Sequence, residues 1–122
     1  MNDAIPSKSI TPAGAEMVRR YIDQSVPYNY FGWVKPRIEK LLEFCRAKFP
    51  AISKGSVASG DVVVFRISAD EAAAHHGVMI DEDRFVFLHA GSGLQIERLS
   101  NRWWGKRLCA AFRPNHDEYY WE

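Results

Sequence analysis

Apolar residues early in the chain recur at the spacing of an α-helix. This stripe consists of Ala15, Val18, Tyr21 and Ile22. Its period predicts an amphipathic helix that turns Arg19 and Arg20 toward solvent. Thr11 and Pro12 suit the N-cap and the first position of this helix, because a threonine hydroxyl can accept a free backbone N–H and proline has no N–H to leave unpaired.

A second helical stripe follows an aromatic loop at residues 27–33. We expect this helix to begin at Pro36 and to end before Pro50, because proline is tolerated in the first turn of a helix and not in its interior. Its apolar positions are Ile38, Leu41, Leu42 and either Phe44 or Cys45. The segment that follows, up to Gly60, is rich in serine, lysine and glycine and predicts a loop.

From residue 61 onward the pattern is that of a sheet. Runs of β-branched and aromatic residues predict strands at 61–67, 74–81, 84–90, 93–99 and 107–113. Turn residues at 81–83 and 91–93 join the second, third and fourth of these strands into a meander. Residues 101–105 predict a short helix or turn carrying Trp103 and Trp104, one of which we expect in the core. Helices first and strands afterwards is the order of an α+β domain.

The composition narrows the class of protein. The chain has 122 residues, which suits an arm at 1–10, one folded domain at 11–114 and an acidic, aromatic tail at 115–122. Apolar residues make up 47% and charged residues 25%, as in ordinary globular domains. The net charge of +1 gives no electrostatic footprint for nucleic acid. No apolar run approaches the roughly 20 residues that span a bilayer, and the N-terminus lacks the features of a secretory signal.

Candidate chemistry centres on two histidines in neighbouring predicted strands. His75 stands near the start of one strand and His89 near the end of the next, so we expect their imidazoles side by side on one face of an antiparallel sheet. His76 points to the opposite face and is expected to be structural. A metal site built from His75, His89 and a cysteine has no ligand-spacing motif behind it, so we expect no metal and no cofactor.

The order of these motifs resembles the NlpC/P60 cysteine peptidases, which cut the stem peptides of peptidoglycan. The motifs are Ser59-Gly60-Asp61 before an apolar strand, His75-His76-Gly77-Val78-Met79-Ile80, and Phe87-Leu88-His89-Ala90 before Gly91-Ser92-Gly93. The resemblance implies a papain-like fold, with N-terminal helices packed on a five-stranded antiparallel sheet. It also implies that His75 is the base and His89 the residue that orients it. In many members, however, the spacing between these two residues would place the orienting residue at Phe87.

The cysteine nucleophile of that family is missing from its expected place. Aligning residues 29–34 with the family's Asp-Cys-Phe-Gly-Leu-Val motif puts Tyr30 at the nucleophile position. A tyrosine hydroxyl, with a pKa near 10, cannot replace a thiolate in acyl transfer. Cys45 falls near the end of the second predicted helix and Cys109 within the last predicted strand. Both are expected to be free thiols, and neither sits at the helix start that lowers a thiol pKa.

The resemblance therefore favours a catalytically degenerate domain, a structural or adaptor subunit in the tail tip of a tailed phage or gene transfer agent. The run from Ile96 to Leu108 is similar to the versions found in such tails. Its expected partners are tail proteins, with peptidoglycan as a further ligand, and its expected location is the virion tail, or the host cytoplasm before assembly.

Two alternatives stay open: an active peptidoglycan peptidase or amidase using Cys45 or Cys109, and a small binding module without a phage connection. Exposed-looking aromatic residues are the expected docking surface for a partner. They are Tyr28, Phe31, Trp33, Tyr119, Tyr120 and Trp121.

Overall fold

The computed structural model describes residues 12–25, 40–67, 75–89 and 93–114. The helices in these ranges are α1 (Pro12–Ser25), α2 (Lys40–Lys48), the single 3-10 turn η1 (Lys54–Ser56) and α3 (Arg102–Gly105). The strands are β1 (Ala51–Ile52), β2 (Val62–Phe65), β3 (His75–Met79), β4 (Arg84–His89), β5 (Gly93–Arg98) and β6 (Leu108–Phe112). The predicted arm at 1–10, the aromatic loop at 27–33, the helix start at Pro36 and the tail at 115–122 lie outside the described residues.

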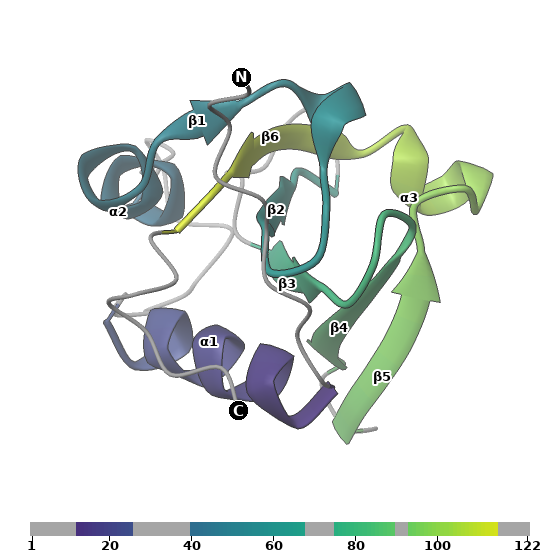
Figure 1. Cartoon of the computed structure of the whole chain (residues 1–122), viewed down its shortest axis with the longest axis horizontal. Coiled ribbons are helices and arrows are strands. Elements are labelled where there is room, and N and C mark those ends of the chain that lie inside the picture. The colour runs from purple at the N-terminus through teal and green to yellow at the C-terminus, as the bar shows by residue number, and fades with distance from the viewer. Residues whose placement is uncertain (1–11, 26–39, 68–74, 90–92, 115–122) are drawn as a thin grey trace, which may run out of the picture.

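The strands form one antiparallel sheet in the order β1-β6-β2-β3-β4-β5. The predicted meander is confirmed, since β3, β4 and β5 are neighbours in chain order (Figure 1). The predicted count of five strands was one short. The additional strand, β1, has two residues and pairs with β6, and two residues are too few to show the period of a strand.

Strand β2 is buried on both of its faces and divides the core in two. Val62 and Val64 belong to a first cluster that includes apolar residues of α1 and α2, so these helices cover one face of the sheet, as predicted. Val63 and Phe65 belong to a second cluster on the opposite face, where Trp104 of α3 packs. Trp103 is 46% exposed, whereas Trp104 is half-buried and packs against the second cluster. The tryptophan expected in the core therefore lies at the margin of the core.

Gly77 allows β3 to approach β4 closely. A Cβ atom added there would lie 2.6 Å from the Phe85 ring and 2.9 Å from the Val86 carbonyl oxygen. Real Cβ atoms do not tolerate such contacts, and the obstruction includes backbone that cannot turn aside. The glycine of the His-His-Gly sequence is therefore required by the packing of the sheet.

A salt bridge closes the loop that leads into β2. Asp61 is fully buried, and its carboxylate accepts hydrogen bonds from Arg113 Nε at 2.9 Å and from Arg113 Nη2 at 2.8 Å. It also accepts the backbone N–H of Ala58 at 2.8 Å. The hydrogen bonds to Asp61 raise the pKa of Arg113 above its usual value. Gly60 precedes the carboxylate with φ of 90°, a conformation that favours glycine.

The predicted outward position of Arg19 is wrong. Its side chain is buried on α1, and its Nε lies 2.6 Å from Glu16 Oε1. Burial alone would raise the pKa of Glu16, but hydrogen bonds from Arg19 and Arg20 outweigh it and lower that pKa. The stripe of apolar residues did not reveal that Arg19 is buried. A buried guanidinium is tolerated here because it pairs with Glu16 on the same helix.

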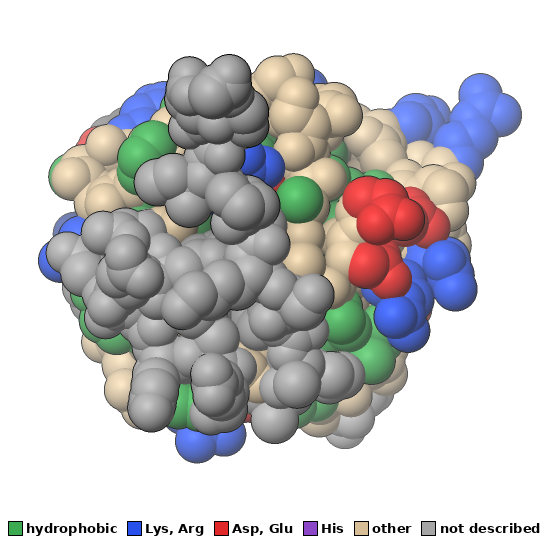
Figure 2. All heavy atoms as spheres, viewed as in Figure 1, with side chains coloured by type: hydrophobic (Ala, Val, Ile, Leu, Met, Phe, Trp, Pro, Cys, Tyr) green, Lys and Arg blue, Asp and Glu red, His purple; other side chains and the backbone are tan. Residues whose placement is uncertain are grey.

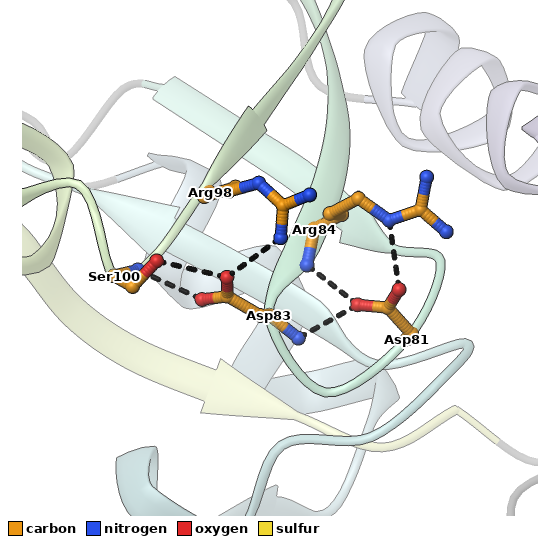
Figure 3. Close-up of polar contacts among 5 residues, drawn as sticks. All are labelled: Asp81, Asp83, Arg84, Arg98 and Ser100. Atoms are coloured by element: carbon orange, nitrogen blue, oxygen red, sulfur yellow. Dashed lines mark hydrogen bonds and ion pairs between the residues drawn. The ribbon is translucent and has the colours of Figure 1, made fainter.

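Polar contacts also fix the end of the meander. Figure 2 shows acidic and basic side chains gathered on the side of the molecule where β5 lies in Figure 1. Asp81 accepts the backbone N–H groups of Asp83 and Arg84, which lower the pKa of Asp81 to about 2. The Asp83 carboxylate accepts hydrogen bonds from the Arg98 guanidinium and from the backbone N–H and hydroxyl of Ser100 (Figure 3). These bonds join the β3–β4 turn to the end of β5.

We expect the substitution Arg113→Met to lower the free energy of unfolding by about 3 kcal/mol, because it leaves the buried Asp61 carboxylate without its cation. Urea unfolding followed by circular dichroism measures this change. The matched control is Arg98→Met, which removes an exposed arginine from Asp83 and should cost roughly 1 kcal/mol or less. Equal losses in the two variants would contradict a special role for the Asp61–Arg113 pair.

Candidate functional site

His75 begins β3, in the middle of the sheet. Its Cα partner on β2 is Phe65, and the partner of His76 is Val64. Because paired residues of antiparallel strands share a face, His75 lies on the face of the second cluster and His76 on the face covered by the helices. The His75 side chain is exposed, so this face is open to solvent at the start of β3.

His89 ends β4, the strand next to β3, as the sequence predicted. The two strands pair Val78 with Val86 and Met79 with Phe85, and the same register continued along both strands sets residue 75 opposite residue 89. The His89 side chain lies outside the described residues, so the shared face of the two imidazoles stays a prediction.

Phe87, the other candidate for the residue that orients the base, is a core residue. It is buried in the second cluster, with its ring centroid 5.9 Å from that of Phe85 and 4.8 Å from that of Trp104. Phe87 carries no group that could orient an imidazole.

His76 is structural, as predicted. Its ring is buried against α1, and Nε2 lies 3.3 Å from the backbone oxygen of Arg19. Burial lowers the pKa of His76 from 6.5 to about 4, and the nearby charge of Arg19 acts in the same direction. The ring is therefore neutral at physiological pH and serves as a contact between β3 and α1.

The two cysteines of the chain lie on the helix-covered side of the sheet. Cys45 is fully buried on the inner face of α2, and Cys109 of β6 is half-buried against the same first cluster. Burial raises the pKa of the Cys45 thiol to about 12. The cause is desolvation of the thiol rather than its distance from a helix start.

The sheet therefore separates both thiols from His75. A cysteine nucleophile needs an imidazole within hydrogen-bond reach and surroundings that favour the thiolate. Cys45 has surroundings that disfavour the thiolate, and both cysteines belong to the face opposite His75. The geometry of the described residues does not assemble a cysteine–histidine dyad.

The remaining predicted site residues lie outside the described part of the chain. They are Tyr30 at the expected nucleophile position and the proposed docking residues Tyr28, Phe31, Trp33, Tyr119, Tyr120 and Trp121. Among the described residues, no group of three or more histidine, cysteine, aspartate or glutamate side chains is arranged to hold a metal ion. No described helix has the length and apolar character to cross a membrane.

Sequence reasoning missed an apolar surface on β4 and β5. Leu88, Leu94 and Ile96 are each about half exposed. The alternation of Leu94 and Ile96 with Gln95 and Glu97 predicted the strand correctly. A strand pattern names the residues that share a face, but it does not say whether another element covers that face.

The chain belongs to the NlpC/P60 family. The model of that family matches residues 15–113, which includes every described strand and the whole of α2 and α3. The motifs that carried the resemblance, from the Gly60-Asp61 turn to the β4 strand, all fall in this range. Membership puts the chain in a family of cell-wall hydrolase-like proteins.

A solved structure supports the fold. A Staphylococcus aureus protein described as similar to a lipoprotein of the NLP/P60 family superimposes with a TM-score of 0.50 and 20% sequence identity. The match covers 94% of this chain and 45% of that protein, so the chain spans less than half the length of its structural relative. No curated protein sequence matched the chain.

The buried His76 predicts a pH-dependent stability. Between pH 6.5 and 4 the unfolded chain binds a proton at this ring and the folded chain does not, so stability falls as the pH falls. The slope should approach about 1.4 kcal/mol per pH unit in this window. Asp81 adds its own loss only at lower pH, between its ordinary pKa of 3.8 and about 2.

Urea unfolding at a series of pH values tests this prediction. His76→Gln should flatten the slope between pH 6.5 and 4.5, because glutamine does not titrate. His75→Gln, on the exposed neighbour, is the matched control and should leave the slope unchanged. A slope that persists in His76→Gln would show that other groups cause it.

Proposed function

We propose that this chain is a catalytically degenerate NlpC/P60 domain that acts as a structural or adaptor subunit, in the tail tip of a phage or phage-like particle. The observation that carries the proposal is the position of the two cysteines. Both contact the helix-covered core, on the face of the sheet opposite His75.

The buried thiol of Cys45 argues against a hidden active site. Burial raises the pKa of the Cys45 thiol to about 12, so the protonated thiol predominates at pH 7, whereas the thiolate is the reactive form. Cys109 lies within a strand between two paired neighbours, and it is not at the start of a described helix. These surroundings suit small apolar residues rather than nucleophiles.

Tyr30 supports the same conclusion from the sequence side. It stands where the family keeps its cysteine when residues 29–34 are aligned with the family motif. A phenol is a poor nucleophile for amide cleavage at neutral pH because it is protonated there. The histidines His75 and His89 would then be remnants of the base and of its orienting residue.

The described part of the chain nevertheless has a well-packed scaffold. The Gly60-Asp61 turn, the close approach at Gly77 and the six-stranded sheet are all in place. A domain that has its shape but no placed nucleophile can still bind, either to neighbouring proteins or to peptidoglycan that it no longer cuts. Residues 96–108 are similar to tail-tip versions of the family, and this similarity favours the virion tail as the place where the chain acts. Before assembly the chain would be in the host cytoplasm.

The aromatic tail provides the test of the adaptor role. Replacing Tyr119, Tyr120 and Trp121 together by alanine should abolish co-purification with the tail proteins of the particle that encodes the chain. It should leave the thermal midpoint unchanged, because a docking residue contributes to the partner interface rather than to the core of its own domain.

The matched control is Asp117→Asn with Glu118→Gln, which removes charge from the same segment and keeps the aromatic rings. We expect this control to assemble normally. Intact assembly of the alanine variant, or a lowered thermal midpoint in it, would contradict docking through the tail.

A further inference from the structure

Three half-exposed aliphatic side chains gather on β4 and β5. Leu88 is 49% exposed, Leu94 47% and Ile96 49%. Leu88 and Leu94 are direct cross-strand partners, and Ile96 is the partner of the buried Val86. The three therefore form one continuous apolar surface, which we call the β4–β5 patch.

The β4–β5 patch extends the helix-covered face of the sheet. Val86 belongs to the first core cluster, and α1 packs on β3 and β4. Residues that pair with Val86 or alternate with it along β4 share its face. The patch thus begins where the cover of α1 ends, and it reaches the margin of the sheet.

Strand β5 is an edge strand within the described part of the chain. It pairs with β4 on one side, through six consecutive residue pairs without a bulge, and it stands last in the strand order (Figure 1). Alternate N–H and C=O groups of such a strand point away from the sheet. Natural edge strands are commonly protected by lysine, proline, a bulge or shortness. Gly93–Arg98 contains no lysine, no proline and no bulge, and its charged residues, Glu97 and Arg98, stand only at its C-terminal end.

We infer that the β5 edge binds the β5 edge of a second copy of this chain, in antiparallel orientation about a twofold axis at Gln95. This register pairs Leu94 of each copy with Ile96 of the other, and Gly93 with Glu97. The result is a continuous sheet through both copies, a common mode of association through open strands. A twofold axis makes the contact self-complementary and closed.

The register at Gln95 completes the β4–β5 patch. Because Leu88 pairs with Leu94 and Val86 with Ile96, each apolar row then crosses the interface. One row runs Leu88, Leu94, and then Ile96 and Val86 of the second copy. The twofold axis generates the same row in reverse. Cross-strand apolar pairs of this kind stabilise antiparallel sheets.

The charges of β5 favour the same arrangement. Its ionised side chains, Glu97 and Arg98, both lie at its C-terminal end. Antiparallel pairing at Gln95 places the charged ends of the two strands at opposite ends of the interface. Glu97 of each copy then faces the uncharged Gly93 of the other. Parallel in-register pairing would set Glu97 beside Glu97, and like charges directly opposite one another destabilise a sheet.

The interface is small, because it consists of one strand and a few side chains from each copy. We therefore expect a dissociation constant in the micromolar to millimolar range rather than a permanent dimer. Sedimentation equilibrium over rising protein concentrations should show a monomer–dimer equilibrium. Leu94→Lys and Ile96→Lys should each weaken it roughly tenfold or more, since each places an unpaired charge against an apolar partner.

Trp103→Lys is the matched control, because it also replaces a half-exposed apolar residue but lies on α3 rather than on β4 or β5. It should leave the equilibrium unchanged. A chain that stays monomeric at its highest soluble concentration overturns the inference and assigns the β4–β5 patch to a different polypeptide. A dimer that survives Leu94→Lys and Ile96→Lys overturns it as well.

Disulfide trapping tests the register itself. In a Cys109→Ala background, Gln95→Cys should give a covalent dimer on mild oxidation, because the two copies of this position face one another across the axis within disulfide reach. Glu97→Cys should not, since its two copies are offset by four residues, about 13 Å along the strands. Trapping at position 97 in preference to 95 would overturn the proposed register.

Discussion

The salt bridge between Asp61 and Arg113 is the constraint on which the rest of the sheet depends. It joins the turn that begins β2 to the residue that follows β6, and the carboxylate is completely buried. A buried carboxylate must be paired, because an isolated charge in the core costs several kcal/mol. The pair therefore fixes two neighbouring strands at one end, and β2 carries apolar residues from there into both clusters of the core.

This two-sided core explains how the degenerate domain that we propose can keep its fold. The contacts that hold the domain together are the Asp61–Arg113 pair, the Gly77 approach and the packing of α1 and α2. The histidine expected to act as base takes no part in either buried cluster: His75 is exposed at the start of β3, while its neighbour His76 is the ring that packs on α1. Under the proposed function, loss of a nucleophile would consequently leave the fold intact.

Much of the sheet could be predicted from the sequence. The runs of β-branched and aromatic residues in β2, β3, β4 and β6, the alternation in β5 and the turn residues at 81–83 defined the strands to within about two residues. The exceptions have physical causes. Strand β1 is too short to show a period, and the side chain of Arg19 is buried because Glu16 lies three residues before it on α1. The separation of the thiols from His75 depends on which elements cover which face of the sheet, and no local pattern encodes that. The exposure of Leu88, Leu94 and Ile96 escaped prediction for the same reason.

We propose that this NlpC/P60 domain does not cut peptidoglycan with either cysteine. The most direct measurement is mass spectrometry of soluble peptides released from intact sacculi by the purified chain, beside Cys45→Ala and Cys109→Ala. The account predicts no release of stem-peptide fragments above the level in buffer, for all three proteins. Release of such fragments by the unaltered chain that disappears in Cys45→Ala or Cys109→Ala would contradict it.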